Sequence, residues 1–237
     1  PARSFEDLFQ GTRALPWEAL LDKEDAFPVS GSSLSSQLHS VPDCQAIIKK
    51  AIVERLKGKY RLSWFPETGP LHRVRFRILK DKVSLMVDTS GEGLHKRGYR
   101  RESNLAPMKE TLAAALCKLA RVRPDGNFID PFCGSGTLLI EAALLAGNIA
   151  PGLRRTFQAE SWRDADPQVW RRERERAKDL ERRDITFTAT GYDIDPAAAA
   201  LTLENAKKAG VAAQVRAWVR DIRDFREEGP YGCVVCN

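Results

Sequence analysis

The sequence has no apolar run near the roughly 20 residues that a membrane-spanning helix needs. Its start, "PARSFEDLFQ", lacks both an initiator Met and the basic-then-apolar order of a secretory signal. We therefore expect a soluble, cytoplasmic protein without a membrane partner, and an N-terminal piece that is missing from this chain. Nothing in the sequence indicates an oligomeric state.

Patterns that bind metals or create nucleophiles are also scarce. The five Cys and three His follow no ligand spacing, so we expect free thiols, a reducing compartment and no metal. Cys233 and Cys236 form a C-x-x-C, but in an extended strand a separation of three places them on opposite faces. Cys133 has no His partner nearby in the sequence, which favours a small packing residue over a nucleophile.

What the sequence does contain is a balance of apolar and charged residues. Hydrophobic residues make up 43% and charged residues 30% of the 237 positions, as in a globular protein with one large domain or two small ones. The chain has 38 basic and 32 acidic residues, a formal net charge of +6. That charge is compatible with a polyanion as partner but does not identify one.

Residues 1–94 have the pattern of a mixed α/β region. The stretch 26–38 resembles a strand with a loop, and 41–60 has helical spacing, with Pro42 and Asp43 suited to its start and Gly58 to its end. Residues 74–87 alternate apolar and polar side chains around a central turn, which predicts a hairpin. Glycines and cations at 95–106 indicate a linker.

Residues 107–237 alternate between strand and helix patterns. We expect helices at 107–122, 137–146 and 196–210, and strands ending near 130, 193 and 221, followed by a buried strand at 231–237. Such alternation is typical of a parallel sheet with crossover helices. The fold class expected for this half is therefore α/β, with a Rossmann-like sheet.

An Arg-rich insert at 151–184 interrupts that half. Its tract Val169–Arg183 mixes Arg with Glu and Asp at helical spacings, as in a solvated helix with weak ion pairs. An RNA-facing surface is the alternative, with Trp162 and Trp170 either stacking on bases or packing against protein.

The stretch "DPFCGSGT" at 130–137 joins a strand to a helix through two glycines. It is not a phosphate loop, because no Lys follows at the required spacing, and Leu139 breaks the dinucleotide pattern G-x-G-x-x-G. Instead, Asp130 precedes Gly134 and Gly136. A carboxylate there would repel a pyrophosphate and accept a hydrogen bond from a cationic amino group, so we expect a ligand that is positively charged in part.

S-adenosylmethionine has that chemistry, since it carries an ammonium and a sulfonium. Asp193 in "GYDID" would accept its ribose hydroxyls and Asp221 its adenine amine, with Ile194 and Ile222 as apolar walls. Other roles stay open: an acid at Asp193 or Asp195 is suited to capping the next helix, and Asp221 to a solvated turn.

These motifs resemble those of class I methyltransferases. With "VPDCQAIIKKAIVERL", "DTSGEGLHKRGYR", "APMKETLAAALC" and "IEAALLAGNIAPGLRR", the chain is similar to the THUMP-domain family, and in particular to bacterial methyltransferases of the guanine N2 amine in ribosomal RNA, 23S type. The resemblance implies a THUMP/ferredoxin-like RNA-binding domain at 1–94, a linker at 95–106 and a methyltransferase domain at 107–237. It implies S-adenosylmethionine as cofactor, bound by Asp130, Pro131, Phe132, Gly134, Ser135, Gly136, Thr137, Asp193, Ile194, Asp221, Ile222 and Pro107.

The family's catalytic signature, [DNS]-P-P-[YF], is represented here by Asn237 alone. The family implies that this Asn and a following proline carbonyl accept the two amine hydrogens, while the aromatic residue stacks on the base. We therefore expect a piece of a longer protein that, by itself, binds poorly or does not turn over at all. A DNA adenine-N6 methyltransferase shares the signature and stays an alternative, as does a non-catalytic RNA-binding protein.

Cations surround an aromatic residue in the linker. A set of this kind is suited to contacts with an RNA backbone and stacking on a base, although a solvated linker would look the same. The set consists of Lys96, Arg97, Tyr99, Arg100 and Arg101.

Overall fold

The computed structural model describes residues 1–100, 108–226 and 232–237. They form two compact units. The first consists of Pro1–Glu92 with Phe157–Asp166, and the second of Gly93–Thr156 with Pro167–Asn237. A segment from inside the predicted Arg-rich insert therefore belongs to the first unit.

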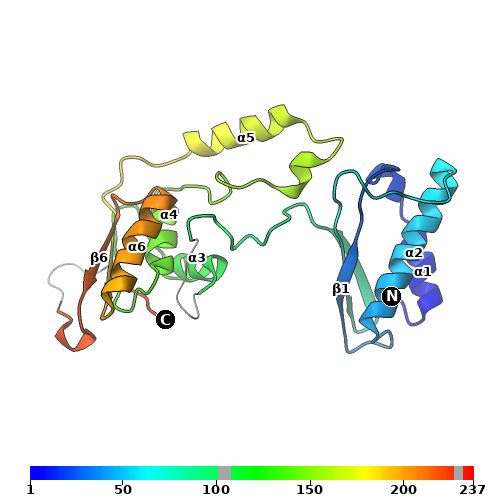
Figure 1. Ribbon diagram of the computed structural model, residues 1–237. Helices are drawn as coiled ribbons and strands as arrows, with labels where there is room; N and C mark the ends of the chain where they lie inside the picture. Colours follow the sequence, from blue (N-terminus) through cyan, green and yellow to red (C-terminus); the bar gives the residue numbers. More distant parts are fainter. Residues whose placement is uncertain (101–107, 227–231) are drawn as a thin grey trace. The chain divides into compact units, whose positions relative to one another are not determined.

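The first unit is a three-stranded sheet with helices on one face (Figure 1). Strand β1 pairs in parallel with β2, which pairs antiparallel with β3. Buried Phe27, Ile48, Ile52 and Phe76 lie in its core. Its elements are α1 (Phe5–Arg13), η1 (Trp17–Ala19), β1 (Val29–Leu34), α2 (Val41–Tyr60), β2 (Val74–Leu79), β3 (Lys82–Val87) and η2 (Gln158–Ser161).

The predicted hairpin is confirmed as β2 and β3. Alternate residues of β2 are buried, while Arg75 and Arg77 point to the open face of the sheet. The predicted end of α2 at Gly58 is wrong, because the helix continues to Tyr60 and Arg61 caps it at φ 56°. Gly58 faces open space, and the Tyr60 hydroxyl donates to the Leu21 carbonyl at 2.8 Å, which holds the last turn.

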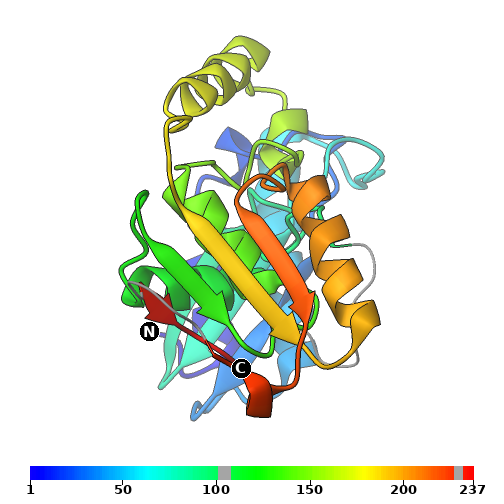
Figure 2. The same cartoon turned by 90° about the vertical axis from the view of Figure 1, so that its left-hand side faces the viewer.

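The second unit contains a parallel sheet in the order β6-β5-β4-β7 (Figure 2). The expected Rossmann-like fold, preceded by a smaller α+β domain, is confirmed. Val234 in the last strand is 54% exposed, so the expectation of a buried strand there is wrong. The elements are α3 (Glu110–Leu119), β4 (Asn127–Asp130), α4 (Thr137–Ala146), α5 (Pro167–Asp179), β5 (Thr188–Asp193), α6 (Pro196–Ala209), β6 (Val215–Val219), η3 (Ile222–Asp224) and β7 (Cys233–Val234).

Helix α4 is the central helix of this unit. Nine of its residues are buried, because it packs against α3, α6 and the sheet. It begins directly after Gly136, so its burial fixes the glycine loop at the edge of the sheet. Helix α5, in contrast, has no buried residue. Within the described ranges, we find no helix that combines the length and the apolar character needed to cross a membrane.

Candidate cofactor site

Three acids follow three neighbouring strands of the parallel sheet. Asp130 ends β4, Asp193 ends β5, and Asp221 comes two residues after β6. In the pairing register Asp130 lies opposite Gly191 and Asp193 opposite Val219. All three acids therefore lie at the carboxyl edge, where open α/β sheets bind their ligands.

Asp130 is 2% exposed, and one of its oxygens accepts a hydrogen bond from the Phe132 N–H at 3.0 Å. Burial raises the pKa of Asp130 to about 6, and the charge of Asp193 adds to the rise. A cationic partner stabilises the ionised form of a carboxylate that is buried and close to a second acid. The edge thus favours a ligand with positive charge.

The glycine loop is fastened to Asp193. Its Oδ2 accepts the Gly134 N–H at 2.9 Å and its Oδ1 the Asp195 N–H at 3.0 Å. Gly136 has φ 79°, and a Cβ there would lie 2.7 Å from Cγ2 of Thr202. Only glycine fits that position without strain.

Two residues that hold the loop were missed in the sequence. The Thr202 hydroxyl donates to the Gly134 carbonyl at 2.9 Å, and Asn205 Nδ2 donates to the Ser135 carbonyl at 3.0 Å. Both side chains are fully buried in α6. Their signal was two polar residues, three positions apart, on a helix otherwise rich in alanine.

Asp221 and Asp195 perform capping roles. Asp195 accepts the Ala197 N–H at 2.8 Å and caps α6, as expected. Asp221 caps η3, and its Oδ2 lies 2.5 Å from Nη2 of Arg223. Hydrogen bonds from Arg223 lower the pKa of Asp221, so this carboxylate is charged but paired at the edge. Its predicted contact with adenine remains a proposal.

Apolar side chains are exposed beside these acids. Phe132 is 50%, Ile194 69% and Ile222 44% exposed. Each adjoins the end of a different strand, so together they provide apolar surface around the carboxylates. Pro131, Ser135 and Thr137 are buried instead, and the Ser135 and Thr137 hydroxyls lie 3.3 Å apart.

Cys133 is buried in the loop, and burial raises the pKa of its thiol to about 12. That value does not suit a nucleophile at neutral pH, so the expected packing role is supported. The five cysteines are all free. The described part of the chain contains no group of three or more His, Cys, Asp or Glu that could hold a metal.

Three residues of the cationic set, Arg97, Tyr99 and Arg100, contact other residues of the second unit. Arg97 and Tyr99 both contact Glu141, with the Tyr99 hydroxyl 3.1 Å from Oε1. Arg100 contacts Thr137 Oγ1 at 3.1 Å and Glu110 at 3.1 Å. Since Tyr99 is 3% exposed, its ring does not fit the predicted stacking on a base.

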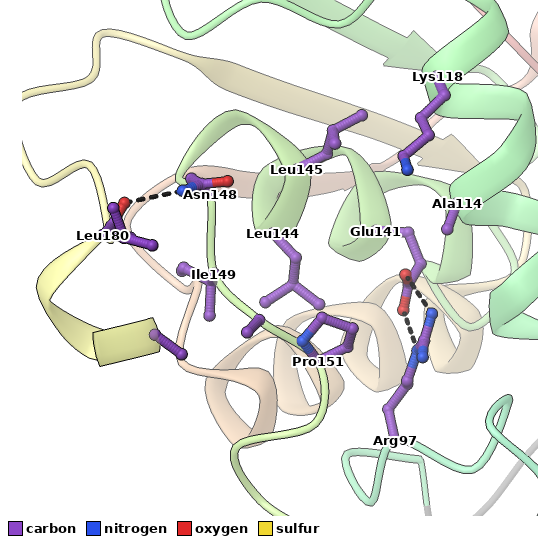
Figure 3. A pocket seen from close by; sticks show the side chains of 12 residues that line it. Arg97, Ala114, Lys118, Glu141, Leu144, Leu145, Asn148, Ile149, Pro151 and Leu180 are labelled. Atoms are coloured by element: carbon purple, nitrogen blue, oxygen red, sulfur yellow. Dashed lines mark hydrogen bonds and ion pairs between the residues drawn. The ribbon is translucent and has the colours of Figure 1, made fainter. Parts of the chain in front are cut away.

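A cavity of about 350 Å³ lies beside this cluster. Figure 3 shows its lining, with the Arg97 guanidinium turned to the Glu141 carboxylate. Its lining is mostly apolar, from α3, α4 and the end of α5, with Lys118 and Asn148 among the polar groups. None of Asp130, Asp193 and Asp221 lines it. The cavity is therefore separate from the edge that carries the three acids.

The other predicted residues are placed as follows. Lys96 is exposed, while Arg101 and Pro107 lie outside the described residues. Val235 N–H donates to the Ile129 carbonyl at 2.9 Å, which aligns the end of β7 with β4. Asn237 follows two residues later and is exposed; it comes after β7, which pairs with the strand that ends in Asp130.

Comparison with known families identifies the class of both parts. Residues 97–237 match the RMKL-like methyltransferase domain, and residues 2–88 match the THUMP domain. The chain therefore belongs to the RMKL-like methyltransferase domain family and carries a THUMP domain before the methyltransferase part. The family expected from the sequence motifs is confirmed.

Individual relatives are similar over the whole chain. "Putative RNA methyltransferase YpsC" of Bacillus subtilis (strain 168) is 43% identical over 239 residues, which cover 100% of this chain and 62% of the relative. A crystal structure described as "a predicted N6-adenine-specific DNA methylase from Listeria monocytogenes str. 4b F2365" is 48% identical, with a TM-score of 0.94 over 99% of this chain and 62% of that one. A third, "SMU.472, a putative methyltransferase complexed with SAH", is 40% identical, with a TM-score of 0.93 over 100% of this chain and 63% of that one. This chain thus spans less than two thirds of each relative.

Proposed function

We propose that the protein transfers a methyl group from S-adenosylmethionine to the exocyclic N2 amine of a guanine in RNA, with ribosomal RNA of the 23S type as substrate. The carboxyl edge with Asp130, Asp193 and Asp221 is the observation that carries this proposal. The relative described with bound SAH and the relative named as an RNA methyltransferase support it.

The residues at the edge fit this cofactor. Asp130 is buried and its raised pKa makes it a receptive partner for the ammonium of the methionine part. Gly136 carries no Cβ, which lets the loop pack closely against Thr202 of α6. Exposed Phe132, Ile194 and Ile222 offer apolar walls for an adenosine.

Each acid then has a role in holding the cofactor. Asp193 would accept the ribose hydroxyls with lone pairs left after its two backbone contacts. Asp221 would accept the adenine amine. Held by these acids, S-adenosylmethionine would supply an electrophilic methyl group on a sulfonium, with the neutral thioether as leaving group.

Asn237 is the residue proposed to hold the target amine. It follows β7, beside the strand of Asp130, so it lies at the same edge as the cofactor site. Its side-chain oxygen would accept an amine hydrogen and turn the nitrogen lone pair toward the methyl group. Positioning of this kind supplies a large part of catalysis in such transfers; the amine proton then passes to solvent.

The first unit offers a surface for the RNA. On the open face of its sheet, Arg75 and Arg77 lie among small serine side chains and Met86, which is 48% exposed. This face lines an open cavity of about 680 Å³. Exposed guanidinium groups bind phosphates, and the flat apolar part of such a surface accepts bases.

Two measurements on the natural protein test the proposal. Calorimetry with S-adenosylmethionine should give a 1:1 binding heat, and the D130A/D193A variant should give none. Transfer of labelled methyl should occur on unmodified ribosomal RNA, with the label recovered as N2-methylguanine. A binding heat without methyl transfer to RNA would overturn the assignment of RNA as substrate. The absence of a binding heat would overturn the assignment as a methyltransferase and favour a non-catalytic RNA-binding protein.

A DNA adenine-N6 methyltransferase is the rival, since one similar structure bears that description. Duplex DNA therefore serves as the second substrate in the same assay. Label recovered as N6-methyladenine in DNA, in excess of label in RNA, would establish the rival.

A further inference from the structure

The segment Phe157–Asp166 lies between helices α4 and α5 of the second unit, yet its contacts place it in the first unit. The Ala159 N–H donates to the Thr89 carbonyl at 3.0 Å. Nη1 of Arg163 lies 2.8 Å from Oδ2 of Asp22. The chain consequently passes between the units at three places, after residues 92, 156 and 166.

Trp162 forms the centre of this attachment. Its ring stacks on His72, with centroids 4.5 Å apart and planes at 17°. Its Nε1 donates to the Leu71 carbonyl at 3.0 Å. One side chain thus makes a stacking contact and a directed hydrogen bond to consecutive residues of the first unit, which fixes its orientation.

The surface under Trp162 is a buried polar pair. His72 is 2% and Asp25 5% exposed, and Nε2 of His72 lies 3.2 Å from Oδ2 of Asp25. The same Oδ2 accepts the Asp22 N–H at 2.8 Å. The Trp162 ring comes from a distant part of the sequence and packs on this pair, so Pro1–Glu92 provides a defined binding surface for the segment.

We propose that Trp162 is a positioning residue, and that the segment Phe157–Asp166 is a second tether that limits how far the methyltransferase unit can move from the RNA-binding unit. A single linker at Glu92 and Gly93 would leave the two units free to separate. A second fixed attachment shortens the free chain between them and raises the effective concentration of one unit near the other. As far as it concerns RNA, this inference rests on the proposed function.

The test measures the distance between the units directly. Spin labels are placed at Lys59 of α2 and Leu119 of α3, both exposed, as cysteines in a C236S background. W162A should broaden the distance distribution, and W162F, which keeps the stack, should restore most of its width. W170A is the matched control, because Trp170 lies in α5 of the second unit and should leave the distribution unchanged.

A second variant covers the case in which W162A fails to fold. A159P removes the N–H that the Thr89 carbonyl accepts and leaves every residue of Pro1–Glu92 in place, so it too should broaden the distribution. Distributions of wild-type width in a folded W162A or A159P protein would overturn the tether.

Steady-state kinetics of RNA methylation tests the tether separately from the proposed function. W162A should raise KM for RNA by roughly tenfold or more, with kcat and the Kd of S-adenosylmethionine unchanged. An unchanged KM would overturn the positioning role. If wild-type protein methylates no RNA, the proposed function fails, and the distance measurement still decides the tether.

Discussion

The backbone N–H of Gly134 lies 2.9 Å from Oδ2 of Asp193, so the acid at the end of β5 holds the loop that follows β4. The second oxygen of Asp193 holds the Asp195 N–H at 3.0 Å. One carboxylate therefore joins the two loops between which the proposed cofactor binds, so Asp193 shapes the site as well as having a proposed role in binding ribose.

Replacement of Asp193 tests this double role. D193A removes the acceptor of two backbone N–H groups and of the proposed ribose hydroxyls, so the affinity for S-adenosylmethionine should fall by at least about tenfold. D195N is the matched control, since Asn caps a helix as well as Asp and should leave the affinity unchanged. Calorimetry decides; a D193A protein that binds like the wild type would remove Asp193 from the site.

Gly136 should not tolerate a side chain. Alanine would adopt φ 79° with its Cβ 2.7 Å from Thr202, so G136A should lower the free energy of unfolding by about 2 kcal/mol or more. G58A is the control, because Gly58 lies inside α2 with open space around it and should gain up to about 1 kcal/mol. Urea unfolding measures both, and equal effects would contradict the strained loop.

The raised pKa of Asp130 predicts opposite effects on stability and binding. Its folded pKa of about 6 exceeds the ordinary value of 3.8, so the folded protein holds a proton that the unfolded chain releases. The free energy of unfolding should therefore fall as pH rises from about 4 to 6, by about 3 kcal/mol in total. D130N should remove that loss and be more stable than the wild type at pH 7.

Cofactor affinity should change in the other direction. Only ionised Asp130 binds an ammonium well, so the affinity of the wild type should fall about tenfold between pH 7 and pH 5. D130N should bind weakly and show no such dependence. An affinity that is flat with pH in the wild type would show that Asp130 does not contact the ammonium.

The elements around the cofactor edge were predictable because their signals are local. The helix at 137–146 was predicted with the bounds that α4 has, since Gly136 precedes it and Gly147 follows it. Asp130, Asp193 and Asp221 each end or follow a strand with a clear apolar pattern. Parallel pairing then requires them to share an edge, whatever the details of packing.

Contacts between distant residues could not be predicted in this way. The linker cations looked available for RNA, but Arg97 has its partner Glu141 in α4, 44 residues away. The role of Thr202 and Asn205 depends on the packing of α6 against the glycine loop, where their side chains donate to loop carbonyls. The segment around Trp162 has no sequence signal that sets it apart as a separate attachment, and its contacts with Thr89, Asp22 and His72 assign it to the first unit.

Because the linker residue Arg97 is paired with Glu141, we expect the RNA to bind the sheet face with Arg75 and Arg77 instead. The salt dependence of RNA affinity tests this location. If Arg75 and Arg77 each neutralise a phosphate of single-stranded RNA, the slope of log affinity against log salt should fall by about 0.7 for each Arg replaced by Ser. R172S is the matched control, because Arg172 is an exposed Arg of α5.

Variants of Arg97 separate the sheet face from the linker. Its side chain is 12% exposed and lies 3.4 Å from Glu141, which is itself 3% exposed. R97S would leave that buried carboxylate without its cation, so it should lower the free energy of unfolding by about 3 kcal/mol and leave the salt slope unchanged. The salt slope of RNA affinity could instead fall in R97S or R172S and stay constant in R75S/R77S. That result would place the RNA contact on the linker or on α5 and not on the sheet of the first unit. Because stability and slope respond to different contacts, one set of purified variants decides between these surfaces.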